Sequence, residues 1–266
     1  MGETIACVNQ KGGVGKTTTV VNLATYLALG GHRVLVVDLD PQGNCTTGLG
    51  VDKPAVDHSV YEVLVDGAAL SEVVQPTAIA RLSLVPAAAS LAGLEVELAP
   101  LPARERRLSR ALEGGTERYD YILLDCPPSL GLLTVNALTA AASVLIPIQS
   151  EYYALEGLSD LIATVKLVRE HLNPGLEIRG VVLTMYDPRT RLSADVAGEV
   201  RRHLGGAVFE TLIPRSVRLS EAPSYGLPVA LYAPDSRGGQ AYRALAAEFL
   251  RRDALTPSVR RQPVPA

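Results

Sequence analysis

The glycine-rich stretch VNQKGGVGKTTT, residues 8–19, holds two of the four lysines in this 266-residue chain. It ends in Gly-Lys-Thr, as the phosphate-binding pattern G-x-x-x-x-G-K-[ST] does. In that pattern the lysine, here Lys16, reaches the β- and γ-phosphates, and the hydroxyl, here Thr17, binds Mg²⁺. The first glycine of the pattern would fall at position 10, which is Gln10. The physical requirement is still met, because glycines let successive N–H groups face phosphate oxygens and the following helix adds its positive end.

The stretch therefore predicts a site for the phosphates of a nucleotide. The residues expected to contact the nucleotide from this loop are Lys11, Gly12, Gly13, Val14, Gly15, Lys16, Thr17 and Thr18. A phosphate-binding loop ordinarily needs one lysine, so the residue pattern alone leaves Lys11 without a role.

Carboxylates follow two hydrophobic runs. YILLDCPP ends its run at Asp125, and VLVVDLDPQGN ends in Asp38 and Asp40. Ligands of parallel sheets gather at the carboxyl ends of the strands, so all three side chains could face one site. Asp125 is expected to hold Mg²⁺ through water, and Asp40 is expected to stand in a switch loop beside Pro-Gln-Gly. For Asp38, bonding within its own loop is the alternative.

Strand and helix patterns alternate along the chain, which predicts an α/β fold with a doubly wound, mostly parallel sheet flanked by helices. The expected strands cover residues 3–10, 33–40, 81–87, 119–128, 142–149 and 177–186. The expected helices cover residues 16–31, 103–113, 131–140, 154–171, 192–204 and 237–252. Residues 41–80 are the least regular. We expect one domain over residues 1–254 and a disordered, proline-rich tail over 255–266.

The composition favours a soluble protein with an aliphatic core. Hydrophobic residues make up 47% and aromatic residues 5% of the chain, without tryptophan, which suits buried parallel strands. No apolar run approaches the roughly 18 residues that cross a bilayer, and the chain enters its first strand at once, so a cytoplasmic protein is expected. Three separated cysteines without a CxxC pair argue against a disulfide framework or a zinc site.

Four motifs in order, KGGVGKTT, VDLDPQGN, DYILLDCPPSLG and IPRSVRLSEAPSYG, resemble the ParA/MinD family of deviant Walker A P-loop ATPases. The likeness is strongest to the chromosomal ParA, or Soj-like, partition ATPases, and it runs from about residue 3 to residue 250. The resemblance implies ATP and Mg²⁺ as ligands and an ATP-dependent homodimer that sandwiches two nucleotides.

The same resemblance assigns roles to individual residues. Lys11 would reach across the dimer to the partner's nucleotide, as an arginine finger does in related enzymes. Asp40 would position the attacking water, Gly12 would lie at the dimer face, and residues 127–128 (Pro-Pro) would form a switch. The family's adenine contacts fall on Met185, Pro214 and Ser216.

Three alternative functions are compatible with such an ATPase. The first is a partition ATPase that binds double-stranded DNA nonspecifically, acts with a ParB-type centromere-binding partner and lies on the nucleoid. The second is a MinD-like regulator at a membrane surface, and the third is an iron–sulfur reductase subunit or cluster carrier. The cysteine positions disfavour the third. The second is weakened because the last ten residues hold three prolines and no Phe, Trp or Leu. We expect no membrane partner.

The distribution of positive charge favours the first function, a partition ATPase that binds DNA. Residues 151–266 carry 15 basic and 13 acidic side chains, whereas residues 1–150 carry 10 and 15, so a polyanion site belongs to the C-terminal half. Arg189 and Arg218 match positions that bind DNA in Soj-like proteins. Helper positions, for which solvated helix faces are the alternative, are Arg191, Arg201, Arg202 and Arg215.

Overall fold

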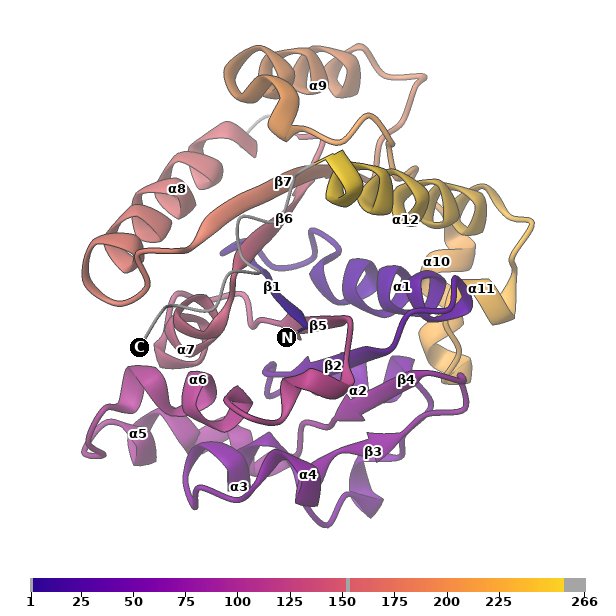
Figure 1. The fold of residues 1–266 in the computed structure, drawn as a ribbon. Coiled ribbons are helices and arrows are strands. Elements are labelled where there is room, and N and C mark those ends of the chain that lie inside the picture. The colour runs from indigo at the N-terminus through magenta and orange to yellow at the C-terminus, as the bar shows by residue number, and fades with distance from the viewer. Residues whose placement is uncertain (1, 152–153, 256–266) are drawn as a thin grey trace.

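The computed structural model describes residues 2–151 and 154–255, and within them seven strands form one sheet (Figure 1). The strands are β1 (Glu3–Cys7), β2 (Val34–Asp38), β3 (Gln75–Pro76), β4 (Leu82–Val85), β5 (Tyr121–Asp125), β6 (Ser143–Gln149) and β7 (Glu177–Thr184). Their order across the sheet is β3-β4-β2-β5-β1-β6-β7. Every pair is parallel except β3 with β4. The predicted doubly wound, mostly parallel fold is confirmed.

Helices cover both faces of the sheet. They are α1 (Lys16–Leu29), α2 (Asn44–Gly48), α3 (Val60–Leu64), α4 (Leu70–Val73), α5 (Leu94–Leu98), α6 (Arg107–Leu112), α7 (Leu132–Ala140), α8 (Ala154–His171), α9 (Arg191–Leu204), α10 (Val217–Glu221), α11 (Val229–Tyr232) and α12 (Arg237–Leu255). Short 3₁₀ turns cover Lys53–Ala55, Ala89–Gly93, Arg104–Arg106, Thr116–Arg118, Gly205–Ala207 and Ala222–Tyr225.

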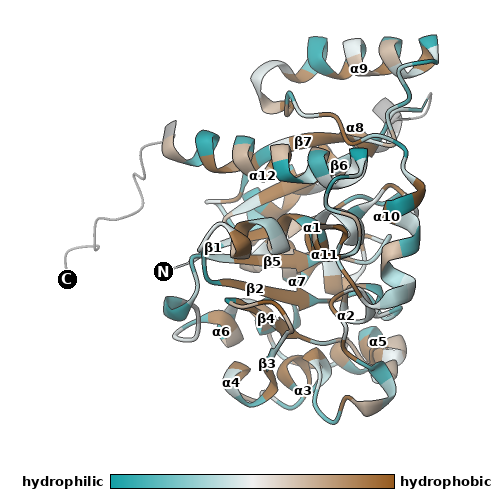
Figure 2. Ribbon diagram, turned by 90° about the vertical axis from the view of Figure 1, so that its right-hand side faces the viewer, coloured by the Kyte–Doolittle hydropathy of each residue, from teal (hydrophilic) through white to brown (hydrophobic). Residues whose placement is uncertain are grey.

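Two buried aliphatic clusters hold these layers together. Alternate side chains of each strand point to opposite faces, so Ala6 joins one cluster and Ile5 the other. The first cluster packs against α3 and α5–α9, and the second against α1, α2 and α12. The strands between them are hydrophobic along their length (Figure 2). The low aromatic content is thus accommodated by a core of Val, Leu and Ile.

The ends of the long elements follow local sequence signals. Helix α1 stops at Leu29 because Gly31 takes a φ of 96°, and its N–H donates to the carbonyl of Ala28. Helix α9 buries Ser193, Val196, Ala197 and Val200, a spacing that places one helix face on the core.

The short elements were not predicted individually. Helices α2–α5, α10 and α11 and strand β3 have only two to five residues each, too few for a hydrophobic period to be recognised. Of the expected tail, Leu255 ends α12, and residues 256–266 lie outside the described residues. No helix in the described part of the chain is long and apolar enough to cross a membrane.

Candidate nucleotide site

The phosphate-binding loop joins β1 to α1 at the carboxyl edge of the sheet. Gly13 and Gly15 take φ values of 75° and 88°, left-handed conformations that glycine adopts without steric penalty. Lys16 begins α1 and is 6% exposed, and its Nζ donates to the carbonyl of Lys11 at 3.3 Å. The Lys16 ammonium is therefore directed under its own loop.

Two polar side chains that sequence reasoning missed hold this loop in place. Asn9 accepts from the Lys11 N–H at 2.9 Å and donates to the carbonyl of Pro147 at 2.8 Å. The hydroxyl of Thr184, the last residue of β7, donates to the carbonyl of Val14 at 2.8 Å. Asn9 lies inside the quoted motif and could have been singled out as a buried polar residue, whereas nothing local marks Thr184.

Asp125 ends β5 with an unusual environment. It is completely buried, and neither carboxylate oxygen has a hydrogen-bond partner of standard geometry among the described residues. Burial raises the pKa of Asp125 well above its usual value, and the charge of Asp38 adds to this effect. The hydroxyl of Thr17 and the charge of Lys16 lower the same pKa, so both groups lie near the carboxylate.

Asp38 stands opposite Asp125 in the pairing of β2 with β5, yet its oxygens are occupied. They accept from the N–H and hydroxyl of Thr46 at 2.8 and 2.7 Å and from the N–H of Asp40 at 3.2 Å. Burial is the main cause that raises its pKa. The Thr46 hydroxyl also accepts from the N–H of Ala87 at 2.9 Å. Asp38 thus bonds its own loop to β2 and β4, the alternative that the sequence left open.

Asp40 lies at the same edge as Asp125. Its side chain is 7% exposed and accepts from the N–H of Gln42 at 2.9 Å, and its charge raises the pKa of Asp125. One Asp40 oxygen closes the turn at Gln42.

These groups fit a divalent cation beside bound phosphates. A buried carboxylate without partners is costly, and Mg²⁺ prefers carboxylate, hydroxyl and water oxygens. Thr17 and Asp125 are the residues that would hold it, with Asp125 acting through water as the sequence predicts. The N–H groups of the loop and the Lys16 ammonium supply the matching positive surface for phosphate oxygens.

Lys11 differs from Lys16 in both exposure and partner. Its side chain is 46% exposed, and its Nζ lies 2.9 Å from Oε2 of Glu151, just after β6. Glu151 also accepts from the amide of Gln149. Gly12 is exposed beside Pro128, whose Cβ lies 4.0 Å from the position that a Cβ of Gly12 would take. The Lys11 side chain is therefore exposed at the surface of the loop, whereas the Lys16 ammonium is buried and bonds the Lys11 carbonyl.

The three expected adenine contacts come together beyond β7. Met185 has a left-handed φ of 51°, and the adjoining Tyr186 pairs with Pro214 in a parallel bridge. The N–H of Tyr186 donates to Ile213 at 3.0 Å, and that of Arg215 donates to Tyr186 at 3.2 Å. Because Thr184 also holds the phosphate loop, this pair of segments adjoins the nucleotide site; contact of Met185, Pro214 and Ser216 with adenine stays a prediction.

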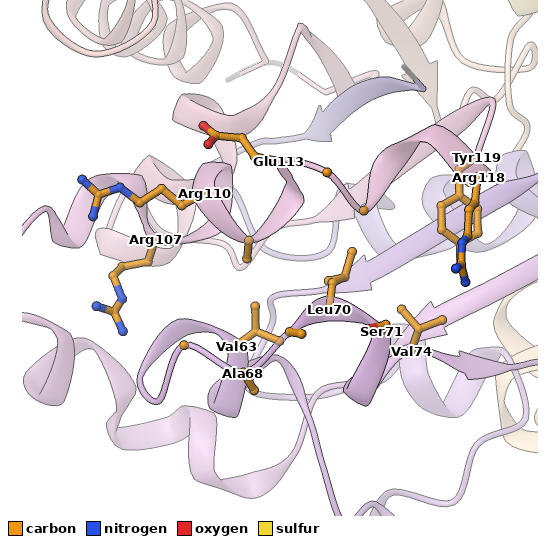
Figure 3. Close-up of a pocket in the computed structure, with 15 residues that line it drawn as sticks. Val63, Ala68, Leu70, Ser71, Val74, Arg107, Arg110, Glu113, Arg118 and Tyr119 are labelled. Carbon is orange, nitrogen blue, oxygen red and sulfur yellow. The ribbon is translucent and has the colours of Figure 1, made fainter.

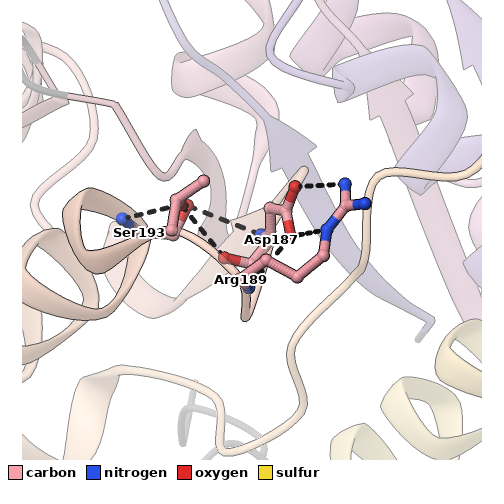
Figure 4. Close-up of polar contacts among 4 residues, drawn as sticks. Asp187, Arg189 and Ser193 are labelled. Carbon is pink, nitrogen blue, oxygen red and sulfur yellow. Dashed lines mark hydrogen bonds and ion pairs between the residues drawn. The ribbon is translucent and has the colours of Figure 1, made fainter.

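The arginines expected to bind DNA are each engaged by a nearby acid. Arg189, 85% exposed, donates from Nε and Nη2 to the two oxygens of Asp187 at 2.9 and 2.7 Å (Figure 4). This fork holds the pKa of Asp187 at about 2. Arg218 lies 2.8 Å from Glu221 on α10.

The helper arginines divide into two groups. The charge of Arg215 also lowers the pKa of Asp187, the acid that pairs with Arg189. Arg191 and Arg202 pair with acids of their own helix, α9, as solvated helix faces do, and Arg201 bonds the carbonyl of Glu210.

Comparison with known proteins decides the family. A family model described as AAA domain matches residues 2–178. The sporulation initiation inhibitor protein Soj of Bacillus subtilis is 57% identical over 248 residues, which cover 93% of this chain and 98% of that protein. This chain is a Soj-like member of the ParA/MinD ATPase family.

Other members of the family carry related names. The chromosome partitioning protein ParA of Caulobacter vibrioides is 51% identical over 251 residues, 94% of each chain. The chromosome-partitioning ATPase Soj of Thermus thermophilus is 52% identical over 248 residues, 93% of this chain and 95% of that protein.

Solved structures of the family confirm the P-loop fold and hold its ligands. A Mycobacterium smegmatis protein called cobyrinic acid a,c-diamide synthase, with bound ADP and magnesium, superposes with a TM-score of 0.84 at 38% identity and covers 100% of both chains. The septum site-determining protein MinD of Pyrococcus horikoshii, complexed with Mg-ADP, has a TM-score of 0.79 at 27% identity, covering 97% of this chain and 100% of that one. ATP and Mg²⁺ are thus the ligands that this family's site takes.

Proposed function

We propose that this chain is an ATP-dependent partition ATPase that dimerises on ATP, binds DNA nonspecifically and releases it on hydrolysis. The proposal that the chain is an ATPase rests on Asp125. Its buried carboxylate has no hydrogen-bond partner of standard geometry among the described residues, and it lies near Thr17 and Lys16. The names of the relatives from Bacillus, Caulobacter and Thermus support the partition part.

The phosphate loop binds and orients the nucleotide. Loop N–H groups and Lys16 hold the phosphates, and Thr17 and Asp125 hold the cation. Bound Mg²⁺ supplies positive charge that offsets the charge of the transferred phosphoryl group. Asp40 orients the attacking water and accepts its proton.

Lys11 completes the site of a second copy. Its side chain is 46% exposed and pairs with Glu151, and the neighbouring Gly12 is exposed next to Pro128. Two such surfaces placed face to face bring each Lys11 toward the other copy's γ-phosphate, where a cation stabilises developing charge. A single copy lacks that cation and hydrolyses ATP slowly.

DNA binding follows from the same dimer. Arg189 and Arg218 of two copies double the number of phosphate contacts, so affinity rises steeply when ATP joins the copies. The binding is sequence-blind and salt-sensitive. A ParB-type centromere-binding protein, together with DNA, stimulates hydrolysis and thereby release, and the protein acts in the cytoplasm on the nucleoid.

DNA gel retardation with and without ATP, at several salt concentrations, tests this function. ATP-dependent retention that weakens with salt is expected, and Lys11→Ala should lose retention and turnover while it keeps much of the nucleotide affinity. Full activity of Lys11→Ala would reject the role of Lys11 in the partner's site. Liposome pelleting runs in parallel: ATP-dependent pelleting without DNA retention would support the MinD-like alternative instead.

A further inference from the structure

A groove lies at the opposite end of the molecule from helix α9 (Figure 1). It runs between α3–α4 and α6, at the bottom of Figure 1, with a volume of about 770 Å³. Tyr119, on its wall, comes just before β5, whereas Asp125 ends that strand. The groove is thus at the amino edge of the sheet and shares no residue with the nucleotide site.

The floor of the groove is apolar. Val74 and Ala111 line it half-buried, and Val63 and Leu70 lie beneath them in the core. Figure 3 shows Val63, Leu70 and Val74 between the helices. Gly67 and Gly114 border it, and a Cβ added at either position would meet no atom within 4 Å. The partly exposed apolar side chains of Val74 and Ala111 offer a small docking surface for apolar groups.

Arginines stand at both ends of this floor. Arg110 lies at one end and Arg118 at the other (Figure 3), and neither makes a hydrogen bond or ion pair with any group in the described part of the chain. Arg107 differs, because its guanidinium donates to the carbonyls of Leu64 and Val65, both at 2.6 Å, and so ties α6 to α3. One acid lines the groove, Glu113, and its carboxylate points away from Leu70.

We infer that this groove is a docking site for an acidic, amphipathic segment of a partner protein. Apolar side chains of the segment lie on the floor, and carboxylates near its two ends bind Arg110 and Arg118 through paired N–H···O contacts. The two exposed guanidinium groups attract negative charge, and the partly exposed side chains of Val74 and Ala111 between them favour apolar groups. An acidic segment with an apolar stripe meets both needs.

Other occupants fit the groove less well. The chain's own residues 256–266 contain two arginines and no acid. Their positive charge is repelled by Arg110 and Arg118. DNA supplies phosphates but nothing apolar for Leu70 and Ala111 to pack against. Small-molecule sites enclose most of their ligand, whereas this groove is open on one side.

Binding of a model peptide tests the inference. The probe is a fluorescein-labelled peptide of about 15 residues, with leucines on one helical stripe and glutamates at both ends, and anisotropy is measured against the full chain. The expected Kd is on the order of 10–100 μM. A peptide with lysine in place of each glutamate, and one with the leucines scrambled, should bind at least about tenfold more weakly. Equal binding of all three would overturn the proposal, as would no binding at about 1 mM.

Variants of the protein locate the site. Arg110→Glu with Arg118→Glu should weaken peptide binding at least about tenfold. Arg169→Glu with Arg251→Glu, exposed residues elsewhere that change the charge equally, should not. Ala69→Asp adds a carboxylate to the groove wall at the N-cap of α4, where aspartate is favourable, so weaker peptide binding by this variant does not arise from unfolding. Unaltered binding by both groove variants would place the peptide elsewhere and refute the assignment.

ATP turnover and DNA retention of the same variants separate this inference from the proposed function. Both should stay at the level of the unchanged protein. If Arg110→Glu with Arg118→Glu abolished DNA retention while peptide binding persisted, the arginines would form a nucleic-acid surface and the inference would be wrong.

Discussion

Lys11 and Glu151 form an ion pair within a single chain, with 2.9 Å between Nζ and Oε2. Lys11 precedes α1 and Glu151 follows β6, so the contact joins two loops at the carboxyl edge of the sheet. The same ammonium is the group proposed to reach the nucleotide of a second copy. Glu151 and that nucleotide therefore compete for one cation.

Removal of this competitor should favour the dimer. Glu151→Gln keeps the size of the side chain but loses the charge, and exposed ion pairs contribute little, so we expect ATP-dependent dimerisation to tighten by about two- to fivefold. Sedimentation velocity with ATP measures the change. In a chain that also carries Lys11→Ala the gain should vanish; an equal gain there would show that Glu151 opposes dimerisation by another route.

Asp40→Ala should trap the ATP-bound dimer. Loss of the group that orients and deprotonates water lowers turnover by about 100-fold or more, while ATP binding remains. Phosphate release and gel filtration with ATP measure the two effects. Undiminished hydrolysis would reject the role of Asp40.

Asp125→Asn should stabilise the protein without nucleotide and abolish its response to magnesium. Among the described residues neither oxygen of this buried carboxylate has a hydrogen-bond partner of standard geometry, so replacement by a neutral amide should remove a desolvation penalty of about 2 kcal/mol. The midpoint of thermal unfolding should rise by roughly 4–8 °C. Addition of Mg²⁺ to the ADP-bound protein should then raise the midpoint further for the unchanged protein but not for the variant. A lower midpoint for the variant without ligands would show that Asp125 is satisfied by another group.

Arg189→Glu with Arg218→Glu should separate dimerisation from DNA binding. The dimer should form with ATP as before, whereas DNA retention should fall about tenfold or more at 0.1 M salt. The matched control is Arg110→Glu with Arg118→Glu, which changes the net charge equally at the groove. Retention by the Arg189/Arg218 variant equal to that of the control would mean that another surface binds DNA.

Asp187→Asn should strengthen DNA binding. The Asp187 carboxylate accepts the two guanidinium hydrogen bonds of Arg189 that a DNA phosphate would otherwise accept (Figure 4). Loss of this carboxylate should raise the affinity for DNA by only about two- to fivefold, because the ion pair is exposed. Fluorescence anisotropy of labelled DNA with ATP checks this. Glu199→Gln, which frees Arg202 on α9, is the control and should leave affinity unchanged.

The sequence predicts the helices and strands in which the pattern of apolar residues extends over many consecutive positions. Helices α1, α8 and α12 and the buried strands carry enough residues for their periodicity to be recognised, and the loop between β1 and α1 has a spacing that fixes its chemistry. The proximity of Asp38 to Asp125 follows from the edge at which parallel strands end.

The features that could not be predicted from the sequence depend on contacts between residues that are far apart in the chain. The bond from Thr184 to Val14 spans 170 residues, and that from Asn9 to Pro147 spans 138, so neither is visible in any short window. The groove between α4 and α6 is also non-local. By contrast, Glu221 lies three positions after Arg218 on the same helix, and that spacing alone could have indicated the pairing.

Both borders of the sheet are closed to further strands. On one side β3 has only two residues, and Pro76 has no N–H to offer a neighbour. On the other, the chain from Val208 to Ile213 runs along β7 and donates to its carbonyls. Exposed strand borders promote aggregation when many copies crowd together. Copies that collect on DNA, as the proposed function requires, reach high local concentration, and the closed borders disfavour pairing of their sheets edge to edge.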